Sequence, residues 1–514
     1  MGNDANSLKT ARVPIFDLCY MTTATGDIVS IRNIVETIEI VEDIFSPVLT
    51  GSITIADSIG LFDHLPISGN ETITLRFYSS SYDTNNYTTN FIHRTFDVIR
   101  VNNVTSPTDH SKKYTLTLAS PELKKSETIK ISKAYKDMSI SEIVTDIMTG
   151  NHEDPVNPSG LGFPKTASKD NSTPRLTRFF SPFLKDDDIE VNYEDANPTG
   201  ANSVELFVEK TKYKEKVLST PYMKPLDLIK WLATRSLRNA TGRVSYNHPA
   251  NFMFFENKRG FQFVSLNTLL ENKGPNIATF VYGSATANNQ DDNWHLDVIE
   301  KLRIENCYDV LANIRNGIYA SNFMTYEVST GQVTEQPFDY VREFYNNEST
   351  DRSFDIKSQP DYPTIALDKQ GQNPITQKLL ARRMLLPMVH RDYDGVSSGA
   401  TSRFNTALDQ VGPEQYLQSR ISQLSKLVDF RVIVDIPANT QHKVGDMVVL
   451  DLKMWQNKTG TEGGTDKSIE VVDHKYYNGN YLITSIKHSL SQTEYKMQIE
   501  LAKDSLKAMI GPTK

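Results

Sequence analysis

Histidines are the side chains in this 514-residue chain that most readily act as catalytic bases or metal ligands, and there are ten of them. They are scattered, and none forms a His-Glu-x-x-His pair or a Cys/His cluster with zinc spacing. Asp473-His474 and His488 lie near one another in sequence, but the nearest hydroxyls, Ser485 and Ser489, lack the elbow motif of an activated serine. We therefore interpret these histidines as structural and predict no catalytic residue.

An acidic run offers oxygen ligands of the kind that calcium prefers. It comprises Asp186, Asp187, Asp188, Glu190, Glu194 and Asp195. Val191 stands where an EF-hand loop needs glycine, so the spacing fails that pattern. A solvated acidic loop is the favoured interpretation, and we expect no metal site.

The stretch from Gly460 to Ser468 is the nearest approach to a phosphate-binding loop. Thr461 and Asp466 occupy both required glycine positions, and Ile469 to Val472 after it has the pattern of a strand rather than a helix. We expect no cofactor. Paired carboxylates for glycoside hydrolysis come from distant strands, so the sequence singles out no pair, and a carbohydrate-processing enzyme stays open as an alternative.

Composition limits the classes of protein to which the chain can belong. The formal net charge of -8 argues against a surface that grips nucleic acid, because phosphate contacts need clustered Lys and Arg. Two cysteines, Cys19 and Cys307, exclude a disulfide scaffold and fit folding in a reducing cytosol. The N-terminus lacks the pattern of a signal peptide, and no apolar run approaches a membrane span, so we expect a soluble protein without a membrane span.

A helix followed by an aromatic hairpin, from Lys224 to Leu266, organises the rest of the chain. Pro225 suits a first helical position, and Asn239 to Gly242 is the expected stop. Asn257 to Gly260 is the predicted turn of the hairpin. The apolar positions that indicate the helix and the two strands are Leu226, Ile229, Ala233 and Leu237, then Phe252 and Phe254, then Phe261 and Phe263. The pattern predicts a packed α+β module, not an active site.

Period-two strands before this module predict an all-β domain over residues 1–125. Residues 126–297 are predicted to form an α+β domain. A helix begins there at Ser139, with Glu142 completing a capping box, and a long polar insertion spans residues 151–200.

A second β region is predicted over residues 298–345 and 428–506, interrupted by a polar and helical insertion at 346–427. The insertion is expected to carry one helix around Leu379 to Leu386 and another from Pro413. Asn478-Gly479 is the strongest short hairpin signal in the chain.

Several motifs, in their order along the chain, resemble the baseplate hub proteins of contractile-tailed bacteriophages, which are related to the hub part of type VI secretion spike proteins. The residues that carry the resemblance are Trp231, Phe254, Phe255, Glu256, Gly260, Phe261 and Phe263 in the module, Gly445 and Asp446 in Val-Gly-Asp, Gly479, Tyr481 and Ile483 in Gly-x-Tyr-Leu-Ile-Thr, and His488 in Lys-His. The resemblance implies a mainly β fold with α+β subdomains, in which two tube-type antiparallel β-barrels flank the helix and hairpin module.

The same resemblance implies a structural role rather than an enzyme. A homotrimer would place six barrels in a ring that joins the six-fold tail tube, or tube-initiator proteins, to a three-fold central spike protein. Baseplate wedge proteins are further candidate partners, and DNA would only pass through the channel. The expected location is the virion tail baseplate, after assembly in the host cytoplasm. The hub of a secretion or injection machine is the alternative, and a virion-associated carbohydrate-processing enzyme is the rival of a different class.

Overall fold

The structure is a computed structural model of the chain. It describes residues 13–64, 67–79, 91–108, 111–153, 158–163, 175–179, 203–212, 214–238, 250–271, 277–282, 297–306, 309–328, 331, 333–340, 349–351, 383–388, 413–457, 469–474 and 476–505. The acidic run at 186–195, the loop at 458–468 and most of both predicted insertions lie outside the described residues.

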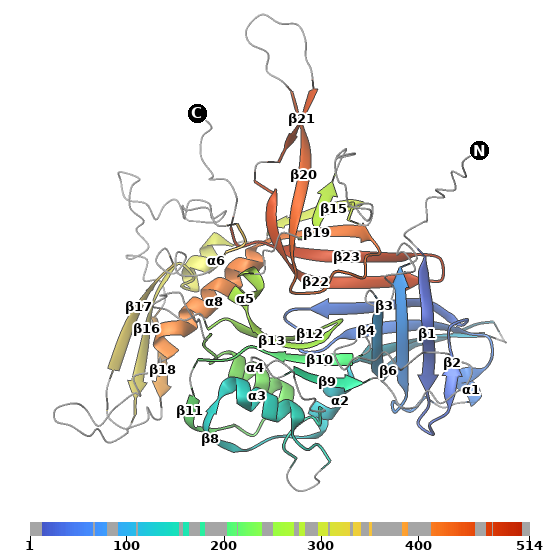
Figure 1. Cartoon of the computed structure of the whole chain (residues 1–514), viewed down its shortest axis with the longest axis horizontal. Helices are drawn as coiled ribbons and strands as arrows, with labels where there is room; N and C mark the ends of the chain where they lie inside the picture. Colours follow the sequence, from blue (N-terminus) through green and yellow to red (C-terminus); the bar gives the residue numbers. More distant parts are fainter. Residues whose placement is uncertain are drawn as a thin grey trace, which may run out of the picture.

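One sheet of 14 strands is the largest element of the fold (Figure 1). Its N-terminal half is ordered β3-β4-β7-β6-β5-β1-β2, and every pair named is antiparallel. The bounds are β1 (Pro14–Thr22), β2 (Ile28–Ser30), β3 (Val35–Asp43), β4 (Thr50–Asp57), β5 (Thr72–Ser79), β6 (Ile92–Thr108) and β7 (Ser111–Ala119), with α1 (Leu61–His64) between β4 and β5. Alternating apolar residues turn one face of these strands inward, as period-two patterning requires.

The C-terminal half of the same sheet is ordered β15-β19-β23-β22, with β20 paired to β22 and to both β14 and β21. The bounds are β14 (Thr279–Tyr282), β15 (Lys301–Asn306), β19 (Phe430–Pro437), β20 (Met447–Asn457), β21 (Ile469–Asp473), β22 (Gly479–Ser491) and β23 (Tyr495–Ala502). β22 pairs with β3 from Ser485↔Asp43 to Ser491↔Thr37, which joins the two halves. Strands from opposite ends of the chain are therefore hydrogen-bonded neighbours.

An α+β unit lies against this sheet, in the lower part of Figure 1. It holds a four-stranded sheet, ordered β12-β13-β10-β9, and a two-stranded sheet of β11 and β8. The bounds are α2 (Pro121–Thr128), β8 (Ala134–Ser139), α3 (Ile140–Thr149), β9 (Arg175–Phe179), β10 (Ser203–Val208), β11 (Lys214–Ser219), α4 (Pro225–Ala233), β12 (Phe252–Asn257), β13 (Gly260–Ser265) and α5 (Leu266–Glu271). The capping box predicted for α3 is present, because Ser139 and Glu142 bond each other's backbone N–H groups.

A third unit packs a three-stranded sheet, ordered β17-β16-β18, against a long helix. Its bounds are α6 (Val310–Arg315), β16 (Ala320–Glu327), β17 (Val333–Asp339), β18 (Arg383–Met388) and α8 (Pro413–Asp429). The stretch from 317 to 340 was expected to begin the second barrel. It lies in this separate sheet instead, and among the described strands of the 298–345 segment β15 alone joins the large sheet.

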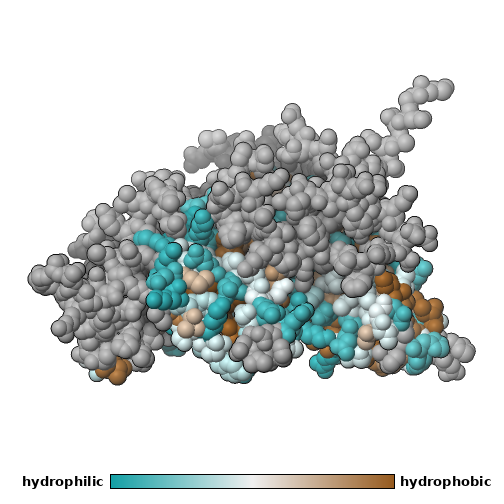
Figure 2. Space-filling view, turned by 60° about the horizontal axis from the view of Figure 1, so that its bottom comes forward, coloured by the Kyte–Doolittle hydropathy of each residue, from teal (hydrophilic) through white to brown (hydrophobic). Residues whose placement is uncertain are grey.

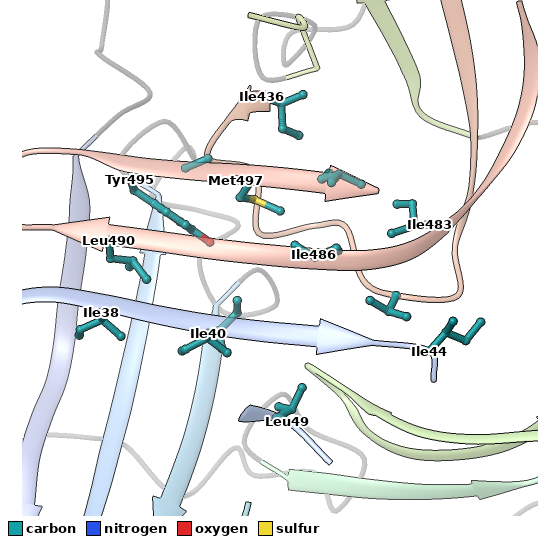
Figure 3. Packing of buried hydrophobic residues seen from close by; sticks show 14 of the residues in the cluster. Ile38, Ile40, Ile44, Leu49, Ile436, Ile483, Ile486, Leu490, Tyr495 and Met497 are labelled. Atoms are coloured by element: carbon teal, nitrogen blue, oxygen red, sulfur yellow. The ribbon is translucent and has the colours of Figure 1, made fainter. Parts of the chain in front are cut away.

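Two hydrophobic clusters hold these units together. The larger contains residues from both halves of the large sheet, among them Ile38 and Ile40 of β3 and Ile486 and Leu490 of β22 (Figure 3). The smaller fills the α+β unit. The mainly β prediction with α+β subdomains is confirmed, since large antiparallel sheets dominate the described residues. Closure of each half into a barrel stays a prediction, as do the domain boundaries.

Two predictions about helices were wrong. α4 ends at Ala233 rather than at 239–242. Beyond Ala233 the backbone N–H groups of Arg235 and Ser236 bond carbonyls three residues back rather than four, while Leu237 stays buried beyond the helix. The apolar stretch around Leu379 to Leu386 forms no helix over its described part, where Arg383–Met388 is strand β18, paired in parallel with β16. In neither case does the apolar pattern distinguish a helix from another buried segment.

Candidate functional site

The aromatic hairpin β12–β13 lies between the two hydrophobic clusters and touches both. On β12, Phe252 and Phe254 belong to the smaller cluster, whereas Met253 and Phe255 belong to the larger one. All six residues of β12 are buried, so this strand has no solvent face. Successive side chains of a strand point to opposite faces, and here the two faces serve two cores.

The module residues of the sequence motif are positioned by ring packing within this hairpin. Phe254 stacks on Phe261, with ring centroids 5.7 Å apart and an interplanar angle of 7°. Phe263 lies 5.1 Å from Phe252. Trp231 is half-buried at the margin of the smaller cluster, with the Arg235 guanidinium 4.0 Å above its ring. These contacts fix the hairpin rather than form a binding pocket.

Glu256 is a buried carboxylate that ties the hairpin to the N-terminal half of the sheet. It accepts hydrogen bonds from the Leu49 backbone N–H at 3.0 Å and from the Ser120 hydroxyl, and Arg94 lies 3.9 Å away. Burial raises the pKa of Glu256 to about 7, and the Arg94 guanidinium opposes that shift. Arg94 also donates to the Asn257 carbonyl at 2.7 Å, so the turn of the hairpin is held by a buried charge.

The turn of the hairpin reaches the C-terminal half of the sheet. The Asn257 side chain donates to the Val444 carbonyl at 3.3 Å, and Lys258 donates to the carbonyls of Thr440 and Gln441. Burial lowers the pKa of Lys258 to about 7.

Gly260 has φ +142°, and a Cβ there would overlap the Glu205 carbonyl of β10. Glycine is therefore required where β10 and β13 run in parallel.

Gly445 and Asp446 form the tight turn that begins β20. Gly445 has φ +91° and lies against the Phe255 ring. A Cβ atom at position 445 would be 3.2 Å from that ring. The Gly445 N–H donates to the Ile483 carbonyl at 3.0 Å, and the Ile483 N–H donates to the Asp446 carbonyl at 2.9 Å. Asp446 also pairs with Lys443. The Val-Gly-Asp motif therefore connects the hairpin to β22.

Gly479 is the first residue of β22 and has φ +136°. The two-residue hairpin predicted at Asn478-Gly479 was wrong, because β21 and β22 each pair with β20 rather than with one another. Glycine is instead needed at position 479 because the Asp351 side chain lies directly against it. The carboxylate of Asp351 packs against Gly479, accepts from Lys503 at 2.6 Å and accepts from the Asn480 N–H at 3.1 Å.

Tyr481 and Ile483 are both fully buried beside this contact. The Tyr481 hydroxyl donates to the Tyr477 carbonyl at 2.7 Å, and the Lys503 ammonium lies 4.9 Å from the Tyr481 ring centroid. The Gly-x-Tyr-Leu-Ile-Thr motif and the segment Lys503-Asp504-Ser505, separated in sequence, therefore meet around Asp351.

His488 lies where β22 pairs with β3 and is fully buried. Its Nδ1 is 2.9 Å from the Tyr495 hydroxyl, and its Nε2 is 3.7 Å from Glu42 Oε1. The Ser485 hydroxyl donates to the Glu42 backbone carbonyl at 3.0 Å rather than to an imidazole. His488 therefore sits in the junction of the two sheet halves, in agreement with the strand position assigned to it.

Sequence reasoning missed the charged partners of these residues. Glu42, Arg94 and Asp351 complete the contacts of His488, Glu256 and Lys503, but none of them lies in a recognisable motif. The described residues contain no group of three or more His, Cys, Asp or Glu side chains placed to hold a metal ion. No helix in the described part of the chain is both long and apolar enough to cross a membrane.

No family model matches the sequence, and no curated protein matches it. Among solved structures, a tail protein from Neisseria meningitidis MC58 is 9% identical with a TM-score of 0.43, over 96% of this chain and 97% of that chain. The 43 kDa tail protein of prophage MuSo2 from Shewanella oneidensis is 9% identical with a TM-score of 0.42, over 95% of this chain and 99% of that chain.

A third structure is the E. coli c3393 protein, a component of the type VI secretion system with described similarity to the T4 bacteriophage tail proteins gp27 and gp5. It is 9% identical with a TM-score of 0.37, over 93% of this chain and 76% of that chain. The structural neighbours are thus phage tail proteins and a type VI secretion component.

Proposed function

We propose that this chain is a structural subunit of a tail baseplate hub. The observation that carries the proposal is the convergence of the ordered sequence motifs on one junction. The turn of the Phe-Phe-Glu hairpin bonds Val444 of Val-Gly-Asp, and Gly445 of the same motif bonds Ile483 near the start of β22. The contacts are buried and hold two β regions in one sheet, which suits a protein that bears mechanical load rather than one that opens to bind a substrate.

The finer proposal is a homotrimer that forms a ring between the tail tube and the central spike protein. Its support is the sequence resemblance and the geometry of the large sheet. Within the described residues, the end strands β15 and β2 are each paired along one edge. Exposed strand edges need partners, and closed oligomers supply them. The tail tube or its initiator and the baseplate wedge would be the further partners, and DNA would pass through the central channel of a virion assembled in the host cytoplasm.

The test is co-purification with its central spike protein, followed by measurement of mass and symmetry. We expect three copies of this chain on one three-fold spike, and an inner wall that is not densely lined with Lys and Arg. A stable complex with one or two copies would overturn the ring. If the spike protein carries an effector and does not belong to a virion tail, that result would favour the hub of a secretion or injection machine.

Absence of catalytic activity is part of the same proposal. The purified protein should release no products from peptidoglycan or common polysaccharides. Reproducible turnover that disappears when two carboxylates are substituted would instead favour the carbohydrate-processing alternative.

A further inference from the structure

The C-terminal half of the large sheet meets itself at one short contact. β14 pairs with β20 along one edge, over its whole length of four residues. Along its other edge β14 contacts residues 297–299, which lead into β15, through the isolated bridge Val281↔Val298. Because β15 is joined to β20 through β19, β23 and β22, the series of paired strands returns to β14 at this bridge. We call the contact between Val281 and residues 297–299 the seam.

Within the described residues, two backbone hydrogen bonds make the seam. The Val281 N–H donates to the Asp297 carbonyl at 3.2 Å, and the Ile299 N–H donates to the Val281 carbonyl at 2.9 Å. By comparison, β15 pairs with β19 at six consecutive positions. The seam also reaches the surface, because the neighbouring Tyr282 side chain is 38% exposed. A strand contact with few backbone bonds, close to water, is a place where a folded protein opens locally.

Side chains cross the seam where its backbone contacts are few. The His442 ring packs edge-on against the ring of Phe280 in β14, with centroids 5.0 Å apart. Its Nε2 lies 2.8 Å from Asp297 Oδ1, on the other side of the seam. Asn439 donates to the same Asp297 oxygen at 2.8 Å. One imidazole therefore contacts both sides of the seam, and one carboxylate holds residues 297–299 to the loop that carries His442.

The loop that carries His442 is fixed to the rest of the molecule. His442 is 5% exposed and Asn439 is 1% exposed, and Lys258 donates to two backbone carbonyls between them. Burying polar groups is unfavourable unless they keep hydrogen-bond partners. If residues 297–299 moved away, His442 and Asn439 would each lose one partner. These side chains therefore favour the closed seam.

We propose that the seam is a latch, which opens while β14 stays paired with β20 and the rest of the sheet stays folded. The side chains of Asp297, Asn439 and His442 set how often it opens. The closed latch covers one edge of β14. Opening frees the Val281 N–H and carbonyl, the main-chain groups by which an edge strand pairs with another strand. The inference concerns a single chain and does not depend on the hub function.

Amide hydrogen exchange of the full chain, resolved to single residues by mass spectrometry, tests the latch. The Val281 and Ile299 amides report on the seam, whereas the Val449 amide reports on the β14–β20 pairing, since it donates to the Ala278 carbonyl at 2.9 Å. In the wild type, after correction for intrinsic rates, we expect the two seam amides to exchange about tenfold faster than Val449. Exchange of all three at one rate would overturn the proposal, because β14 would then leave β20 whenever the seam opens.

Two variants test the side chains that hold the latch closed. Asp297→Ala removes the carboxylate and should quicken exchange of the two seam amides about tenfold further, with Val449 unchanged. His442→Phe keeps an aromatic ring in place but cannot bond Asp297, and it should quicken the same two amides. Thermal melting establishes that each variant is folded. Unchanged seam amides in both variants, or equal quickening of Val449, would contradict the latch.

The control is Asp146→Ala in α3. Like Asp297, Asp146 bonds two side chains, Lys133 Nζ at 2.7 Å and the Tyr135 hydroxyl at 3.0 Å. It lies in the α+β unit, on the side that Figure 2 brings forward, where hydrophilic residues gather across the middle. The seam amides should exchange in this variant as they do in the wild type. Quickening of the seam by Asp146→Ala as large as that by Asp297→Ala would overturn the proposal.

Discussion

Gly479 occupies a backbone position that a larger residue cannot take, for two independent reasons. Its φ is +136°, and a Cβ would overlap the Asp351 carboxylate that Lys503 also contacts. Gly479→Ala should lower the free energy of unfolding by about 3 kcal/mol, from backbone strain plus steric overlap. Gly26→Ala is the matched control, since Gly26 has φ +91° with nothing within 4 Å of its Cβ position, and strain alone should cost about 1 kcal/mol. Equal losses in urea titrations of the two variants would show that the contact with Asp351 is unimportant.

Glu256 makes stability depend on pH in a direction opposite to that of most carboxylates. Its pKa is raised from 4.5 to about 7, chiefly by burial. Between these values the folded protein holds a proton that the unfolded chain has released. The contribution of Glu256 is therefore full below pH 4.5 and is lost as the pH rises through 7.

Glu256→Gln should remove this dependence, because the amide still accepts from Leu49 but does not ionise. The wild type should lose stability relative to the variant between pH 5 and pH 8 in urea titrations. Glu494→Gln, on a half-exposed carboxylate paired with Lys496, is the control. Parallel stability curves for wild type and Glu256→Gln would contradict the assignment.

At the scale of elements, the Arg420 guanidinium anchors α8 to the α+β unit, together with a hydrogen bond from the Asn251 amide to Gln423 Oε1 at 2.6 Å. Arg420 Nη1 donates to the carbonyls of Ala250 at 2.8 Å and Phe252 at 2.7 Å. Burial lowers the pKa of Arg420 to about 10, so these carbonyls offset a charge with reduced access to water. Arg420→Met should cost about 2 kcal/mol and speed amide exchange in α8. Arg420→Lys should recover only part of the protection, since an ammonium is more strongly hydrated than a guanidinium and costs more to bury. Unchanged exchange in Arg420→Met would exclude this anchor.

The elements that the sequence predicted well are those whose signals are local. The capping box at Ser139, the aromatic hairpin and the period-two strands each depend on neighbouring residues, and all are present. The elements it predicted poorly depend on distant pairing. β18 runs parallel to β16, and nothing near Arg383 indicates that partner.

The candidate site divides in the same way. Gly445 and Gly479 are identifiable because their φ values are positive, and the sequence marks such positions with glycine. Glu42, which approaches His488, is distant in sequence and lies in an ordinary amphipathic strand. A buried partner of this kind becomes visible only when the strand order is known.

At the scale of the whole molecule, one sheet and one hydrophobic cluster connect the two ends of the chain, so both halves should unfold together. The connection is the β3–β22 pairing, where Ile40 is 1% exposed and packs in the larger cluster. Ile40→Ala should cost about 3 kcal/mol through lost burial and the cavity left behind. Because the halves share the sheet, amide exchange should quicken by similar factors in β5 and β23, on opposite sides of the junction. The control is Ile147→Ala in α3, within the smaller cluster, which should quicken exchange mainly in the α+β unit. If Ile40→Ala quickened exchange in β3 and β5 but left β23 unchanged, the two halves would be separate cooperative units, and a hub built on their rigid union would lose its physical basis.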